Sequence, residues 1–222
     1  MNLTPVRTPM VAKKMFQNYI WEMPSEAKTL YLSFDDGPTP EITNWILDVL
    51  NQFNAKSTFF CIGKNIAKYP DVFKNIIDNG HIVGNHTFDH IKGWRTSTKN
   101  YVKNITQTQK IIDSQSINPK TNFKNLFRPP YGQIRPIQGK ALINLGFQVI
   151  MWDVLSFDWD KEVLKEQCLN NVVSNASDGS IIVFHDSLKA EKNMKFALPR
   201  VLEHFSKQGY SFRSINSKYI PE

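Results

Sequence analysis

Apolar residues along this chain follow two alternating patterns, which together predict a fold of strands and helices. Short apolar runs are typical of buried strands, and apolar residues three or four positions apart are typical of amphipathic helices. Strands are expected at residues 29–34, 57–62, 81–84, 126–128, 147–152, 180–184 and 210–215. Helices are expected at residues 41–53, 65–79 with an interruption near Pro70, 98–113, 137–145, 161–174 and 198–207. This alternation predicts a mainly parallel α/β sheet with right-handed crossovers, either open or closed into a barrel.

The length of 222 residues fits one domain with a sizeable core. An apolar fraction of 41% and an aromatic fraction of 12% exclude a disordered chain. Residues 1–28 are expected to form an extension that packs on the body through Met15, Ile20 and Trp21, and residues 29–222 a single main domain. The polar residues 118–124 are expected to form a surface loop.

The charge and the cysteines narrow the class of partner. The formal net charge is +7, from 27 Lys and Arg against 20 Asp and Glu, which suits an acidic partner or polymer. The basic residues are scattered and no zinc-finger cysteine pattern occurs, so nucleic acid is not an expected partner. Cys61 and Cys168 permit a disulfide but do not argue for one. Residues 15–21 are too short and too polar for a signal peptide or a membrane span, although export by another route stays open.

Polar side chains gather where the expected strands end. They are Asp35 and Asp36, His86, Arg128, Asp158, and His185. The carboxyl ends of the strands carry the active site in α/β barrels. These residues, although spread over the chain, are therefore expected to converge.

Two histidines and one carboxylate form a candidate metal site. His86 and His90 are four residues apart, so one helical turn is expected to place both imidazoles on one side. Two histidines and a carboxylate make an open zinc site, and Asp36 is the natural third ligand. The histidine pair alone can arise by chance, and Asp36-Gly37-Pro38 alone is ordinary turn chemistry. Their combination favours the metal site, whereas His81 and His204 are expected to be structural.

The loop from Arg128 to Gly132 has two open interpretations. Its prolines fix the backbone and Gly132 permits a close approach, as in a rigid turn that carries a surface arginine. Alternatively, Arg128 lies under the site as a charge partner, and the Tyr131 N–H is free to bind an oxyanion.

The aromatic and acidic residues 152–159 fit a core or a sugar-facing cleft, and His185 fits a structural or a functional role.

Five stretches, in their order along the chain, resemble the motifs of the polysaccharide deacetylase family, the NodB-homology enzymes of carbohydrate esterase family four. They are residues 33–38, 86–90, 128–132, 158–159 and 183–185. The resemblance covers roughly residues 28–216 and implies a distorted, incomplete (β/α) barrel. It makes residues 29–222 a catalytic domain that removes acetyl groups from N-acetylglucosamine polymers such as peptidoglycan and chitin, or O-acetyl groups from xylan.

The resemblance also implies roles for the first three motifs. Asp36, His86 and His90 would hold a divalent metal, usually zinc. Asp35 would be the general base, and Arg128 would pair with it.

The resemblance also implies that His185 would be the general acid and Asp158 its partner, and that the Tyr131 N–H in the third motif would bind the oxyanion. The residues that would line the acetyl pocket are Trp159, Val183 and Pro129. Val183 stands where the family usually has leucine, and residues 155–157 differ from the commonest ones. Substrate preference is therefore left open.

The expected partner is an acetylated polysaccharide, with no nucleic acid and no membrane span, and with the oligomeric state open. Two other hypotheses remain. One is a hydrolase of the same fold that acts on O-acetyl xylan or on a small amide or imide. The other is a metal-retaining carbohydrate binder without turnover, against which the retained Asp35 and His185 argue. The missing signal peptide points to the cytoplasm, and a wall substrate points to the cell envelope or beyond, so the compartment also stays open.

Overall fold

A parallel sheet forms the body of the protein. The computed structural model describes residues 4–24, 28–115 and 125–215, so the loop expected at residues 118–124 lies outside the described residues. The strands of the described chain pair in the order β5-β4-β3-β2-β1-β7-β6, with β8 also paired to β1, and every pair is parallel. Their bounds are β1 Thr29–Asp35, β2 Thr58–Cys61, β3 Ile82–Asn85, β4 Asn125–Phe127, β5 Phe147–Val149, β6 Val154–Leu155, β7 Ile181–His185 and β8 Ser211–Phe212.

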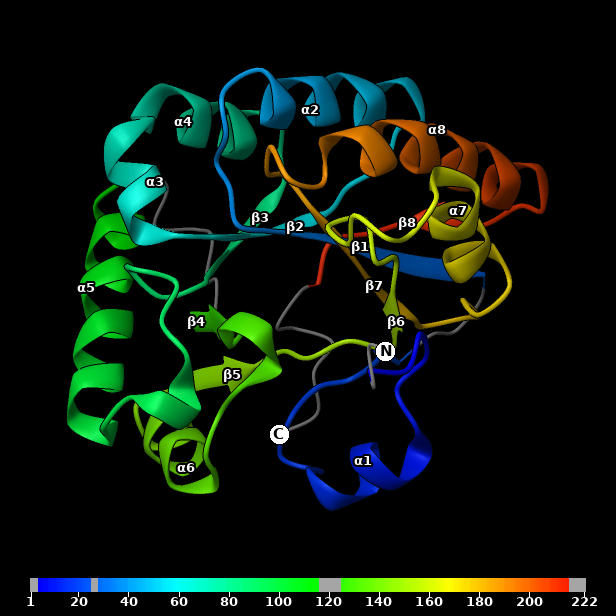
Figure 1. Cartoon of the computed structure of the whole chain (residues 1–222). Helices are drawn as coiled ribbons and strands as arrows, with labels where there is room; N and C mark the ends of the chain where they lie inside the picture. Colours follow the sequence, from blue (N-terminus) through cyan, green and yellow to red (C-terminus); the bar gives the residue numbers. More distant parts are fainter. Residues whose placement is uncertain (1–3, 25–27, 116–124, 216–222) are drawn as a thin grey trace.

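The sheet curls into an incomplete barrel with helices on its outer side (Figure 1). Adjacent strands twist relative to one another, so a long parallel sheet closes progressively. Within the described chain the end strands β5 and β6 are not paired with each other. The predicted distorted, incomplete (β/α) barrel is confirmed.

Apart from α1, which precedes β1, the helices lie between successive strands, as the pattern predicted. Their bounds are α1 Met10–Met15, α2 Ile42–Gln52, α3 Gly63–Lys68, α4 Pro70–Asp78, α5 Thr98–Gln115, α6 Pro136–Asn144, α7 Lys165–Val173 and α8 Glu191–Lys207, with short 3₁₀ turns at Gly93–Arg95 and Pro130–Gly132. The interruption expected near Pro70 is confirmed, because α3 ends at Lys68 and α4 begins at Pro70.

Several boundaries differ from the sequence prediction. Helix α8 begins at Glu191 rather than at residue 198, because Met194 and Ala197 belong to its buried face. Residues 153–160, for which no strand was expected, contain β6, whose two residues pair with β7. The closing strand is only Ser211–Phe212, and His81 precedes β3 rather than lying within it.

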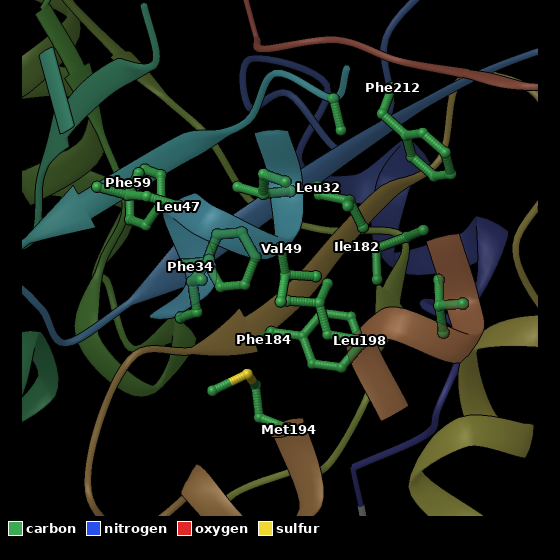
Figure 2. Packing of buried hydrophobic residues seen from close by; sticks show 14 of the residues in the cluster. Leu32, Phe34, Leu47, Val49, Phe59, Ile182, Phe184, Met194, Leu198 and Phe212 are labelled. Carbon is green, nitrogen blue, oxygen red and sulfur yellow. The ribbon is translucent and has the colours of Figure 1, made fainter. Parts of the chain in front are cut away.

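The main core fills the space between the sheet and the outer helices (Figure 2). Phe34 on β1 is in register with Phe59 on β2 and Phe184 on β7. Their rings stack, with centroids 5.0 and 6.2 Å from that of Phe34. Since alternate residues of a strand face opposite sides, Ser33 and Asp35 point to the barrel interior. The apolar ladder on one face therefore fixes the polar residues on the other.

The segment before β1 contacts both ends of the open sheet. Ile20 pairs with Ile150, just after β5, and Arg7 pairs with Val154 in β6. Of its expected apolar anchors, Ile20 and Trp21 pack against the body. Met15, however, is 69% exposed, so its predicted packing is wrong. It lies at the end of the short helix α1, and buried Tyr19 and Met23 serve as anchors instead.

A buried charge network also ties this segment to the body. Lys13 is buried, and its Nζ lies 2.6 Å from Asp153 Oδ1 and also contacts Glu22. The fully buried Asp153 carboxylate further accepts hydrogen bonds from Arg7 Nε and Ser180 Oγ. Because an unpaired buried charge is costly, this network holds the segment in place. None of the described helices has the length and apolar character needed to cross a bilayer.

Candidate metal centre and active site

The site residues meet because the strands that carry them are neighbours. Asp35 is the last residue of β1 and is in register with Phe60 on β2 and His185 on β7. His86 directly follows β3 and Arg128 directly follows β4. The order β4-β3-β2-β1-β7 thus brings these side chains to the carboxyl edge of one sheet, where parallel α/β folds bind their ligands.

Asp36, His86 and His90 form a compact cluster of metal-ligand atoms. One donor atom from each lies within 4.8 Å of the others. Asp36 Oδ1 is 3.1 Å from His90 Nε2 and 3.7 Å from His86 Nε2. The expected helical turn is wrong, because residues 86–90 form a loop in which Thr87 and His90 have φ values of 65° and 56°. The left-handed backbone of Thr87 and His90, rather than helical spacing, brings the imidazole centroids of His86 and His90 to 5.1 Å from each other.

The cluster has the chemistry of a divalent cation site. Asp36 Oδ1 is buried and has no hydrogen-bond donor within the described chain, although buried carboxylate oxygens are normally satisfied. His86 Nδ1 bonds to the Arg128 carbonyl at 2.8 Å, which leaves Nε2 directed at Asp36. Burial lowers the pKa of His86 to about 4, and the neutral imidazole is the form that binds metals. Two imidazole nitrogens and one carboxylate match an open zinc site.

The histidines also affect the carboxylate. Burial by itself would raise the pKa of Asp36, but the imidazoles of His90, His185 and His86 hold it well below its usual value. Asp36 is therefore ionised, the form that a cation site requires.

Arg128 lies beneath the site as a buried charge partner, not on the surface. It is completely buried, and its Nη1 lies 2.8 Å from Asp35 Oδ1 and 2.7 Å from Ser33 Oγ. Its Nη2 donates to the Met151 carbonyl at 2.9 Å, and its guanidinium lies over the Phe60 ring at 4.1 Å. Arg128 thereby fixes one carboxylate oxygen of Asp35.

His185 lies on the other side of Asp35, held by Asp158. Asp158 is buried, and its two oxygens accept from the His185 backbone N–H at 2.7 Å and contact Nδ1 at 2.9 Å. Burial by itself would lower the pKa of His185, but the Asp158 carboxylate raises it to about 9. The Trp159 ring lies edge-on to this imidazole at 4.6 Å. His185 is therefore held as an oriented imidazolium.

The three residues predicted to line the acetyl pocket lie next to site residues, Trp159 against the His185 ring, Val183 two residues before His185, and Pro129 directly after Arg128. Val183 is buried in a small cluster with Leu155 and Phe157, and half-buried Trp159 packs on that cluster. Pro129 is buried and precedes the turn at Tyr131. These positions are compatible with an apolar pocket beside His185.

The turn that carries Tyr131 is tight. Its hydrogen bonds use the N–H groups of Gly132 and Gln133, and Tyr131 itself has a left-handed φ of 60°. A Cβ at Gly132 would lie 2.6 Å from the Trp152 ring, which explains the close approach expected there. The Tyr131 ring lies 4.7 Å from the His90 ring, and the Lys92 ammonium lies 4.7 Å above the Tyr131 ring.

Sequence reasoning missed the side chains that hold the Asp36 loop. Asp186 is completely buried and accepts hydrogen bonds from Gly37 N at 2.8 Å and Thr43 Oγ1 at 2.7 Å. Burial raises the pKa of Asp186 to about 8. Asn65 Nδ2 donates to the Asp36 carbonyl at 2.7 Å. The only available signal was the position of Asp186 beside His185, because Asn65 and Thr43 lie on helices without a distinctive motif.

Comparison with known proteins identifies the family. The sequence profile for polysaccharide deacetylase matches residues 22–150. The chain is 33% identical to a peptidoglycan-N-acetylglucosamine deacetylase of Bacillus cereus over 198 residues, which are 88% of this chain and 90% of that protein. It is also 33% identical to the peptidoglycan-N-acetylmuramic acid deacetylase PdaC of Bacillus subtilis, over 85% of this chain and 38% of PdaC. The chain belongs to the polysaccharide deacetylase family.

Solved structures agree with this assignment. The Bc1960 peptidoglycan N-acetylglucosamine deacetylase superposes with a TM-score of 0.83 and 31% identity, over 94% of this chain and 95% of that one. A carbohydrate esterase family four pseudoenzyme of Bacillus anthracis superposes with a TM-score of 0.77 and 25% identity, over 91% of this chain and 69% of that one. The fold is thus shared by catalysts and by a pseudoenzyme, and the activity must be argued from the site.

The buried pair of Arg128 and Asp35 gives a testable prediction. Arg128→Met should lower the free energy of unfolding by roughly 3–5 kcal/mol, because it leaves the Asp35 charge buried without a partner. Adding Asp35→Asn to that variant should recover part of the loss, because the unpaired charge is then removed. Urea unfolding of the two variants measures both effects. No recovery in the double variant would show that packing, rather than charge, causes the loss.

Proposed function

We propose that this protein is a metal-dependent hydrolase that removes N-acetyl groups from an N-acetylglucosamine-containing polysaccharide, with peptidoglycan as the preferred polymer. One observation carries the proposal. A three-ligand metal cluster, a carboxylate fixed by Arg128 and an imidazolium fixed by Asp158 meet at one sheet edge. Amide hydrolysis needs these three functions, namely an activated water, a base for its proton and an acid for the leaving amine.

The metal would be held by Asp36, His86 and His90, and zinc fits these ligands best. A bound zinc ion lowers the pKa of a water towards about 7 and polarises a carbonyl oxygen. The nearby Asp35 is assigned as the general base. Arg128 holds one of its oxygens, which fixes the orientation of the carboxylate.

The acid and the oxyanion donor are assigned to His185 and to the Tyr131 backbone. His185 donates the proton that the leaving amine requires, and Asp158 keeps the imidazole charged and oriented. The Tyr131 N–H is assigned to the developing oxyanion, since preformed backbone donors are effective at that task. Trp159, Val183 and Pro129 are assigned to the acetyl pocket.

The charge of the protein favours an anionic wall polymer. The net charge is +7. Lys92 forms no ion pair among the described residues, and its ammonium lies over the Tyr131 ring, which in turn packs against the His90 ring. Relatives named as peptidoglycan deacetylases support the same choice. The proposed substrate lies in the cell wall.

A second candidate is a carbohydrate binder without turnover, because a pseudoenzyme shares this fold. The retained geometry of Asp35 and His185 argues against it. The deciding experiment measures acetate released from peptidoglycan, acetylated chitooligosaccharides, acetylated xylan and small amides. Release from peptidoglycan or chitooligosaccharides is expected. Release from xylan or small amides alone would replace the proposed substrate, and binding without any acetate would favour the binder.

The adjacent aspartates should respond differently to substitution. Asp36→Asn, like His86→Ala or His90→Ala, should remove most bound metal, because each is an assigned ligand. Asp35→Asn should retain the metal but lower kcat by about 10²–10⁴, the usual scale for a general base. Elemental analysis together with acetate release separates the two outcomes. Equal metal loss in the Asp35 and Asp36 variants would contradict the assigned roles.

The pH profile tests the acid. Because the carboxylates of Asp158, Asp36 and Asp35, with Asp158 the largest contributor, raise the pKa of His185 to about 9, His185 stays protonated at neutral pH and activity should fall as pH rises through that value. Asp158→Asn removes this charge and lowers the pKa of His185, so the alkaline limb of kcat/KM should move to lower pH. The acid limb should move less. An alkaline limb that stays in place would show that Asp158 does not maintain the imidazolium.

A further inference from the structure

The peptide bond between Asp36 and Gly37 is held at both of its polar groups by side chains from elsewhere in the fold. Asn65 Nδ2, near the start of α3, donates to the Asp36 carbonyl at 2.7 Å. Asp186, directly after β7, accepts from the Gly37 N–H at 2.8 Å. The two side chains approach the same peptide from helices and strands that are far apart in sequence.

This peptide needs such support because of the residue before it. Asp36 has a φ of 82°, a left-handed conformation that non-glycine residues rarely adopt. Its side chain must nevertheless point at His86 and His90 for the three donor atoms to lie together. A freely rotating peptide would let the backbone return to an extended conformation and would carry the carboxylate away.

The Asp186 carboxylate packs tightly against Gly37. A Cβ at Gly37 would lie 1.8 Å from Asp186 Oδ2, so the carboxylate occupies the space that a side chain would need. The same Oδ2 accepts a hydrogen bond from Thr43 Oγ1 on α2. The Asp186 backbone N–H donates to the Asp35 carbonyl at 3.0 Å. Asp186 is therefore fixed relative to the loop from both sides.

We propose that Asn65 and Asp186 act together as a clamp on the Asp36–Gly37 peptide, and that this clamp presets Asp36 as a metal ligand before the cation binds. They are positioning residues and do not touch the metal or the substrate. The inference rests on the proposed metal centre. Groups that orient ligands commonly change metal affinity by about 10–100-fold, and a preset ligand avoids the ordering that an unheld loop would need on binding.

The test is the Zn²⁺ affinity of the purified apoprotein, measured by competition with a chromogenic chelator. Asn65→Ala and Asp186→Ala, which remove the donor and the acceptor that hold the peptide, should each weaken binding by about 10–100-fold. Because both bonds hold one peptide, the double variant should weaken binding by less than the product of the two single effects. Circular dichroism and urea unfolding verify that each variant is folded.

Matched controls separate positioning from general stability. Asn75→Ala removes another asparagine hydrogen bond, to Asn44, and should leave the affinity within twofold. Asp153→Asn disrupts another buried carboxylate, the partner of Lys13, and should lower stability without changing affinity. Asn65 is half-buried, so its variant is expected to fold even if the Asp186 variant does not.

The possible results are distinct. Single variants that bind Zn²⁺ within twofold of the wild type would overturn the clamp, and so would single effects that simply multiply in the double variant. If the Asp153 variant loses as much Zn²⁺ affinity as the clamp variants, then the loss comes from lower stability in general. That result would also overturn the clamp. If His86→Ala does not weaken Zn²⁺ binding, the proposed metal centre itself fails, whatever the clamp variants show.

Discussion

The buried guanidinium of Arg128 is the constraint on which the arrangement of the site depends. It donates to Ser33 and Asp35 on β1 and to the Met151 carbonyl beyond β5, and it lies over Phe60 on β2. Its own carbonyl bonds to His86. An arginine without solvent must satisfy its donors within the protein, so these groups have little freedom to move separately. The proposed base, Asp35, and one proposed metal ligand, His86, are consequently positioned by a single residue.

The parallel sheet supplies the rest of the arrangement. In a parallel sheet all carboxyl ends lie at one edge, so consecutive strand–loop junctions deliver their side chains to the same place. The stacked Phe34, Phe59 and Phe184 fix the register of β1, β2 and β7 from the outer face. With that register set, Asp35 and His185 must be neighbours on the inner face. Packing on one side of the sheet therefore determines chemical geometry on the other.

The sequence predicted what depends on local pattern. The alternation of strands and helices, the incomplete barrel and the convergence of Asp36, His86 and His90 all followed from periodicity, strand ends or motif resemblance. What depends on tertiary context did not follow. The loop at residues 86–90 was expected to be helical, because spacing does not reveal the left-handed backbone of Thr87 and His90.

The same limit applies to side chains whose importance comes from distant partners. Asn65 and Asp186 lack a motif of their own, and only the folded chain shows that they meet at one peptide. The N-terminal segment was expected to be held by apolar residues, whereas Lys13 and Asp153 form a buried ion pair there. A lysine near a chain terminus normally suggests a solvated position, and nothing in the local sequence indicates its partner.

At Asp36, the residue type that the backbone conformation favours differs from the residue type that the proposed metal site requires. At a φ of 82°, glycine or asparagine is accommodated more readily than aspartate, yet neither supplies an anionic ligand. A single substitution of Asp36 by glycine or asparagine would remove the anionic ligand and would also reduce the backbone strain at this position. Loss of the proposed metal ligand would then carry no penalty in folding, and the scaffold would remain available for binding. At this position, therefore, the conformation that favours folding and the side chain that favours the proposed metal site are different.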